Sequence, residues 1–201
     1  MAQFFMLENH QVYADAAEVA RYLGYKKSNP PDSTVLSEIK SCISEMKEVI
    51  TPKAVYEKFD LTVSGQNKIS FADLSFVSSD LSRNLKGCSQ VIIFASTIGP
   101  GPDALIRKAQ IQNPAKAAVF QATGAMFIES FVDNLNETLE QEAMDFDLSA
   151  RPRFSPGYGD VPLEMQKDFF RLLPCSKIGL TLMNSLIMAP EKSVTAFVGL
   201  C

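Results

Sequence analysis

The sequence predicts an α+β fold, in which a mainly antiparallel sheet is bracketed by helices. Before residue 54 the apolar residues recur every three or four positions, which is typical of amphipathic helices. After residue 54 the period changes to two, and segments 55–63 and 68–71 read as an antiparallel pair of strands joined by a turn at 64–67. A second long helical stretch follows residue 113. Helices on both sides of a strand pair in the chain favour the α+β class.

The composition is that of an ordinary globular protein and indicates one compact domain. The chain has 201 residues, of which 46% are hydrophobic and 21% are charged. We expect an N-terminal helical segment over 1–53 that packs on an α+β core over 54–201. No apolar run has the length of a membrane-spanning helix and no secretory signal is visible, so we expect a cytoplasmic protein without a membrane partner. The net charge of −4 and the lack of a Lys/Arg stripe argue against nucleic acid as the main partner.

Two helices are predicted in the N-terminal segment. The first spans 14–23 and closes on Gly24. After a break at 29–32, Ser33 can cap a second helix, which Pro52 ends. The apolar stripe of this second helix consists of Val35, Ile39, Cys42, Ile43, Met46 and Ile50. The stripe can cover a sheet or a partner surface, and the sequence alone does not choose between them.

A central, buried strand is predicted at 91–95, where the chain has a continuous apolar run of strand length. A short helix over 79–85 precedes it. The segment 98–103 that follows is rich in glycine and proline, and we interpret it as a rigid corner between a strand and a helix. A phosphate-binding loop is disfavoured there, because prolines lack N–H donors and the Lys-Ser/Thr pair of a P-loop is absent.

A long helix is predicted over 114–143 by a stripe that includes Ile128, Val132 and Leu135. Gly124 destabilises such a helix by about 1 kcal/mol relative to alanine, which indicates that another backbone or a ligand comes close there. Glu129 lies beside the stripe, where a carboxylate is either simply solvated or available to a ligand.

The last part of the chain predicts a helix over 162–172 and a hairpin over 177–200 with a connection at 189–192. The four cysteines are far apart in the sequence and there is one histidine, so a structural zinc site has few ligands to draw on. We expect all four to be reduced and packed as small hydrophobic residues.

The most informative segment is the loop from Arg153 to Tyr158. Pro156 fixes its own φ and biases Ser155 toward an extended conformation, while Gly157 permits backbone angles and close approaches that a Cβ atom blocks. The arginine can donate two parallel hydrogen bonds to a carboxylate, and the tyrosine offers a flat face with a polar tip. Such a loop suits a small zwitterion that carries an aromatic base. The alternative is a structural turn whose arginine pairs with a local carboxylate.

Several tracts resemble, in order, the S-adenosylmethionine-binding activation domain of vitamin B12 (cobalamin)-dependent methionine synthase. Upstream tracts look like the free-standing version of that domain. The resemblance covers most of the chain from about residue 91 to residue 200, and it supports the α+β class. The tracts that carry it are 95–99, 121–129, the loop 153–158, 178–182, and 185–194 with its Pro-Glu-Lys-Ser-Val sequence.

The resemblance and the chemistry of S-adenosylmethionine together suggest a set of binding residues. Arg153 would bind the ligand carboxylate, the backbone of 154–157 would hydrogen-bond the adenine or ribose, and Tyr158 would lie against the ligand. Glu129 and Asp147 would meet the ammonium or balance the sulfonium. The expected binding residues are therefore Arg153, Phe154, Ser155, Pro156, Gly157, Tyr158, Glu129 and Asp147.

The function that the resemblance implies is to position S-adenosylmethionine for a reaction with cobalamin. Such a domain holds S-adenosylmethionine over the corrin after cobalamin has oxidised to cob(II)alamin, while a reductant such as flavodoxin supplies an electron. A chain with this domain alone would dock on a cobalamin-dependent methionine synthase that lacks its own activation domain. We find no nucleophile elbow, catalytic histidine pair or metal cluster in the sequence.

Two departures from the family pattern leave alternatives open. The chain has Met183, Asn184 and Ser185 where large enzymes carry Thr-Glu-Ser, and it stops at Cys201, before further ligand contacts of those enzymes. The pocket would then bind weakly, or be completed by the partner or a second copy. One alternative is a scaffold protein of corrinoid metabolism that does not bind the nucleotide. An independent methyltransferase ranks last, because it needs a Gly-rich loop in a parallel sheet.

Overall fold

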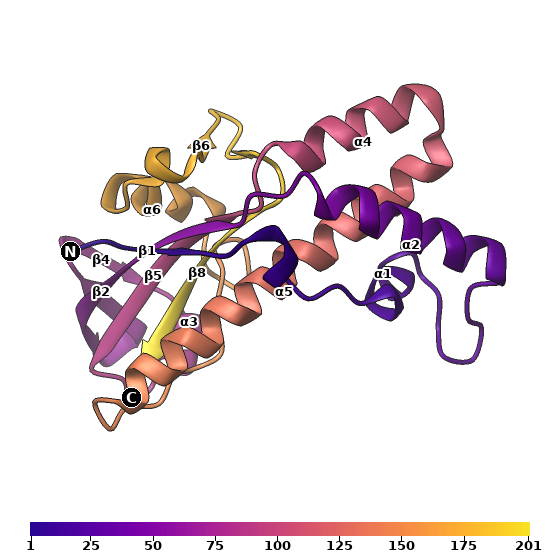
Figure 1. Cartoon of the computed structure of the whole chain (residues 1–201). Helices are drawn as coiled ribbons and strands as arrows, with labels where there is room; N and C mark the ends of the chain where they lie inside the picture. Colours follow the sequence, from indigo (N-terminus) through magenta and orange to yellow (C-terminus); the bar gives the residue numbers. More distant parts are fainter.

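The computed structural model describes residues 1–201 and contains one six-stranded antiparallel sheet with helices on both faces (Figure 1). The strand order is β4-β3-β2-β5-β8, and β1 also pairs with β2. Every pairing in this sheet is antiparallel, so the predicted α+β class is confirmed. The strands are β1 (Gln3–Met6), β2 (Lys53–Ser64), β3 (Lys68–Phe71), β4 (Leu74–Val77), β5 (Gln90–Thr97) and β8 (Ser193–Leu200).

The helices form a large layer on one face of the sheet and a small layer on the other. In the large layer, α1, α2 and α4 pack beside one half of α5, and the other half of α5 runs along the sheet (Figure 1). The apolar stripe of α2 therefore covers a helix, which answers a question that the sequence left open. The large layer consists of α1 (Ala16–Tyr22), α2 (Ser33–Lys47), α4 (Gly101–Gln112) and α5 (Pro114–Met144), and the small layer of α3 (Ser79–Asn84) and α6 (Gln166–Leu172).

Strand β5 lies between β2 and β8 and is buried on both faces, as predicted for 91–95. Ile92 and Phe94 belong to the apolar core under α5, whereas Val91 and Ile93 belong to the core under the small helical layer. Because side chains alternate between the two faces of a strand, helices on both faces require an apolar residue at almost every position.

The predicted hairpin over 177–200 is wrong. Strand β8 pairs with β5, from Ser193 opposite Thr97 to Leu200 opposite Gln90. The preceding segment instead forms its own small sheet of β6 (Thr181–Leu182) and β7 (Met188–Ala189). The physical reason is that β8 is buried on both faces, so it needs a place inside the layered core and not at the end of a solvent-exposed hairpin.

The N-terminal segment 1–53 is less helical than predicted and shares a core with the rest of the chain. Strand β1 extends the sheet beside β2. Val19 and Met46 pack in the same apolar core as Phe127 of α5. The sequence analysis missed β1 and β4, which contain no fully buried residue, whereas the equally short β3 buries Ile69 and Phe71 at a period of two.

The cysteines divide into two pairs. Cys42 and Cys175 are buried free thiols, as predicted, and burial raises the pKa of each to about 12. Cys88 and Cys201 form a disulfide, so the prediction that these two are reduced is wrong. They are 113 positions apart in the sequence, and the pairing of β5 with β8 brings them together. None of the helices combines the length and the apolar character that a membrane crossing requires.

Candidate functional site

The segment that carries Arg153 runs along the open edge of β8. The N–H of Arg151 donates to the carbonyl of Gly199 at 2.8 Å, and Phe154 and Phe197 exchange two backbone hydrogen bonds of 2.9 and 2.8 Å. This pairing fixes the backbone on both sides of Arg153. It also uses the N–H of Phe154, so this donor is not free to bind adenine or ribose as the sequence analysis expected.

The loop after Phe154 turns sharply at Gly157, whose φ is +89°. A side chain would be strained at this angle, so the predicted need for glycine is confirmed. The N–H of Gly157 donates to the carbonyl of Val161 at 2.9 Å, and the N–H of Tyr158 donates to the carbonyl of Ser155 at 3.2 Å. The loop is therefore closed by its own backbone bonds.

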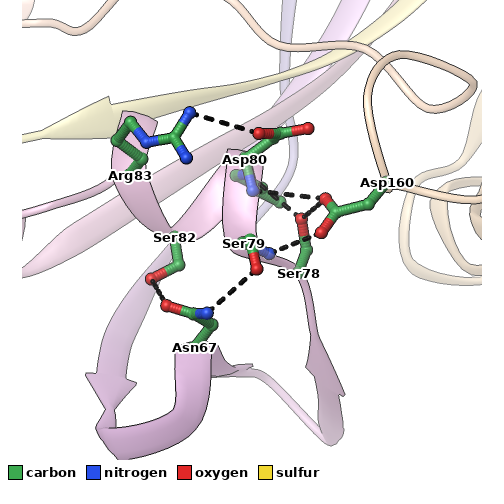
Figure 2. A network of polar contacts seen from close by, with 8 residues as sticks. Asn67, Ser78, Ser79, Asp80, Ser82, Arg83 and Asp160 are labelled. Carbon is green, nitrogen blue, oxygen red and sulfur yellow. Dashed lines mark hydrogen bonds and ion pairs between the residues drawn. The ribbon is translucent and has the colours of Figure 1, made fainter.

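Asp160 anchors the far end of the loop to the start of α3. Figure 2 shows its carboxylate accepting hydrogen bonds from the hydroxyl of Ser78 and the N–H groups of Ser79, at 2.6 Å, and Asp80, at 3.2 Å. These bonds, the one from the Ser78 hydroxyl foremost, hold the pKa of Asp160 below its ordinary value. At Gly159 a Cβ would lie 2.4 Å from Oδ2 of Asp80, so the loop can approach α3 this closely only with glycine.

A cavity of about 460 Å³ lies beside this loop, and we call it the Arg153 cavity. Its size is within the range of pockets that bind small molecules. Its lining comes from α5, the loop, α6, β7 and the start of β8. The lining residues are Glu129, Arg153, Phe154, Ser155, Pro156, Tyr158, Gln166, Met188, Ser193, Val194 and Thr195.

Arg153 combines an internal ion pair with access to the cavity. Its Nη2 donates to Oε2 of Glu129 at 2.6 Å, and its Nη1 donates to Oδ1 of Asp133 at 2.7 Å. The two acids lie one turn apart on α5. Burial opposes the charge of Arg153, but the two carboxylates outweigh it and raise its pKa above the ordinary value. The local carboxylate pairing that the sequence analysis gave as the alternative is therefore present, and a cavity lies beside it, so the contact of Arg153 with a ligand stays a prediction.

The structure brings together six of the eight residues expected at the site. Gly157 shapes the loop but is absent from the cavity lining. Asp147 lies in the turn after the end of α5 and is also absent from the lining. Fifteen residues of helix separate Glu129 from the end of α5 at Met144, which corresponds to about 22 Å along the helix axis. The structure therefore does not place Asp147 with the other predicted residues.

Sequence reasoning missed Asp133 and the polar residues of the opposite wall. The spacing of Asp133 and Glu129 by four positions on a helix was a usable signal. The wall residues Gln166, Ser193 and Thr195 gave none, because they enter the cavity only through the pairing of β8 with β5 and the packing of α6.

Lys192 fixes the start of β8, where the cavity wall begins. Its Nζ donates to Oε1 of Gln121 on α5 at 2.7 Å, and burial lowers its pKa. A Cβ at Gly124 would lie 2.9 Å from Cε of Lys192. The mid-helix glycine therefore accommodates a lysine side chain, and the expected approach of a backbone or ligand is wrong.

The sequence matches no protein-family model and no curated protein sequence. Among solved structures, the chain is similar to a crystal structure described as the MetH reactivation domain bound to AdoHcy. The TM-score is 0.73 and the sequence identity is 17%, and the similarity covers 99% of this chain and 78% of that chain. This similarity shows that the chain has the fold of that reactivation domain.

Proposed function

We propose that this chain binds S-adenosylmethionine (AdoMet) in the Arg153 cavity and acts as the reactivation subunit of a separate cobalamin-dependent methionine synthase. The observation that carries the proposal is the cavity itself, which unites the loop 153–158 with Glu129. It occurs in the fold of a domain whose crystal structure contains AdoHcy, or S-adenosylhomocysteine.

The charges around the cavity are suited to the amino-acid end of AdoMet. Arg153, Glu129 and Asp133 together carry one net negative charge, and AdoMet carries one net positive charge from its carboxylate, ammonium and sulfonium. An arginine has five N–H donors, of which these ion pairs use two. The remaining donors can bind the ligand carboxylate, and Oε1 of Glu129 can accept from the ammonium while Oε2 stays on the arginine.

The rest of the lining is suited to the nucleoside. Phe154, Pro156, Met188 and Val194 supply apolar surface for an adenine ring, and Ser193 and Thr195 supply hydroxyl groups. Tyr158 is 70% exposed although it lines the cavity, which places its ring at the rim. A ring at the rim can lie over a bound ligand and shield it from water.

In this proposal the chain positions a ligand and performs no bond-making of its own. A reductant such as flavodoxin would supply one electron to the cobalamin of the partner protein, the cobalt nucleophile would then take the methyl group from AdoMet, and AdoHcy would be released. The loop that β8 and Asp160 fix at its two ends would hold AdoMet in one orientation. Such positioning converts an encounter of two large cofactors into a reaction within one complex.

Ligand binding is tested by isothermal titration of AdoMet and AdoHcy into the chain. We expect one site for each, with saturable heat. The same titration with a cobalamin-loaded methionine synthase truncated before its own activation domain tests the docking, which size-exclusion chromatography checks independently. Absence of binding both alone and with the synthase would contradict the proposal.

A second candidate function is a scaffold protein of corrinoid metabolism that no longer binds the nucleotide. The observation that favours it is the ion pair of Arg153 with Glu129 and Asp133. The guanidinium already has two carboxylate partners within the protein and does not need a ligand carboxylate. This version predicts co-purification with a corrinoid protein and no thermal shift with AdoMet. A thermal shift that rises with AdoMet concentration would exclude it.

A further inference from the structure

One wall of the Arg153 cavity contains a buried amide that the protein does not satisfy. Gln166 is the first residue of α6, is 6% exposed and lines the cavity. Its Oε1 is buried and has no hydrogen-bond partner. Buried polar groups of native proteins are almost always paired, so an orphan beside a cavity calls for a partner from outside the chain.

The position of Gln166 distinguishes it from other unpaired polar atoms. Four further buried side-chain oxygens lack a partner, and none of them belongs to a residue that lines the Arg153 cavity. Gln166 alone combines an unpaired oxygen with the wall of the proposed ligand site. Those four oxygens belong to Asn84, Asp103, Asn134 and Asn136.

We infer that Gln166 is a specificity-determining residue, whose amide oxygen accepts a hydrogen bond from a neutral donor of the bound nucleoside. This inference rests on the proposed function and adds a residue that forms a hydrogen bond with the uncharged part of the ligand. The charged end already has Arg153 and Glu129, whose charges match a carboxylate and an ammonium better than an amide does. The donors that remain on the ligand are the amino group of adenine and the ribose hydroxyls.

Because Oε1 of Gln166 is itself buried, the contact requires the amide to turn over toward the cavity. Rotation of the amide about its last bond exchanges Oε1 with Nε2 and leaves the rest of the side chain in place. The backbone of Phe154 is occupied by Phe197, so the loop offers fewer groups to the nucleoside than its sequence suggests. The amide oxygen of Gln166, on the opposite wall, would supply a further hydrogen-bond acceptor for the nucleoside.

The test compares AdoHcy binding by the full chain and by the variant Gln166→Met, which keeps the length of the side chain and removes the amide. We expect the affinity to fall by about tenfold to a hundredfold, because the ligand donor is left unpaired against the cavity wall. The melting temperature of the ligand-free protein should stay or rise, because the change removes an unsatisfied buried polar atom. Gln141→Met, on an exposed position of α5, is the matched control.

Ligand analogues identify the donor. S-inosylhomocysteine lacks the amino group of adenine, and 2′-deoxy and 3′-deoxy analogues of AdoHcy each lack one ribose hydroxyl. The difference between wild type and Gln166→Met should disappear with one analogue and persist with the others. Gln166→Leu provides a second apolar variant if Gln166→Met does not fold.

The outcomes separate this inference from the proposed function. If the wild-type chain binds neither AdoMet nor AdoHcy, the proposed function fails. If the wild type binds AdoHcy and Gln166→Met binds it equally well, or if the loss is the same with every analogue, only the role of Gln166 is overturned.

Discussion

Two arginines of this fold each pair with two carboxylates, but only one of them lines the Arg153 cavity, and the other lines a separate cavity. Arg153 pairs with Glu129 and Asp133 and lines the Arg153 cavity. Arg171, on α6, donates to both oxygens of Asp73 at 2.7 and 2.9 Å and to Asp168 at 3.3 Å. Arg171 bonds both oxygens of one carboxylate, whereas Arg153 bonds one oxygen of each of its acids. The two-oxygen pair therefore belongs to the arginine outside the candidate site.

The difference between the two arginines lies in their surroundings. The side chain of Arg153 is 27% exposed and that of Arg171 is 46% exposed. For Arg153 the largest influence on its pKa is burial, which the carboxylates overcome, whereas for Arg171 it is the hydrogen bond to Asp73. Arg153 is half-buried and lies among the other predicted site residues, which is why we propose it as the ligand contact, whereas the more exposed ion pair of Arg171 contributes little to stability.

The largest effect is expected when each arginine is removed in turn. Arg153→Ala should weaken AdoMet binding about a hundredfold or more, because it removes a charge-assisted contact and leaves two acids unpaired at the site. Arg171→Ala should leave the affinity within about twofold, as expected for a surface ion pair. Isothermal titration of both variants checks this. Similar affinities would refute the role of Arg153.

The anchor of the loop should have a smaller effect, which depends on pH. Asp160→Asn weakens the bonds to the start of α3, so AdoMet affinity should fall by roughly tenfold through a looser loop. Because the folded state lowers the pKa of Asp160, its stabilising effect is complete above the ordinary carboxyl range near pH ~4. That effect disappears as the pH falls through the lower folded-state pKa.

Thermal melts of wild type and Asp160→Asn over a pH series measure this linkage. The wild type should melt higher at pH 7, and the difference should shrink at acid pH. A difference that stays constant down to the lowest pH at which the protein folds would show that the carboxylate charge is not involved.

A third prediction concerns the choice between AdoMet and AdoHcy. The net negative charge of Arg153, Glu129 and Asp133 should favour the sulfonium ligand by about threefold to tenfold at low salt. Asp133→Asn removes that net charge, so the preference should largely vanish. Asp73→Asn, at the partner of Arg171, is the matched control. Titrations of both ligands at two salt concentrations give the ratio, and an unchanged ratio in Asp133→Asn would rule out the charge argument.

The smallest effect is expected for Tyr158→Phe. The ring at the rim remains and only the hydroxyl is lost, so AdoMet affinity should fall by no more than about threefold. Tyr158→Ala removes the ring as well and should weaken binding further. If Tyr158→Phe is as damaging as Tyr158→Ala, the hydroxyl and not the ring makes the contact.

Local sequence patterns predicted the parts of the fold that have their own period. The helix over 114–143, the strand pair at 55–63 and 68–71 and the buried strand at 91–95 all emerge from apolar spacing, and the structure confirms them. The partner of β8 could not be predicted in this way, because an apolar strand is compatible with any free edge of the sheet. The prediction of a local hairpin was wrong for that reason.

The part of the candidate site that lies in one segment of the chain could be predicted from the sequence. The parts that form where several elements pack together could not. The conformation of the loop follows from Pro156 and Gly157, so its turn could be predicted from the sequence. Gln166 and the anchor at Asp160 depend on elements far apart in the chain, such as α3 and the loop, which are about eighty positions apart. Asp147 was assigned from the family resemblance, and its place after the end of α5 puts it outside the cavity lining.

The most direct test of the account is the crystal structure of this chain grown with AdoHcy. We predict that the ligand lies in the Arg153 cavity, with its carboxylate on Arg153, its ammonium on Glu129 and its nucleoside toward Gln166. A ligand bound elsewhere on the chain, or a cavity filled only by solvent at saturating AdoHcy, would contradict it.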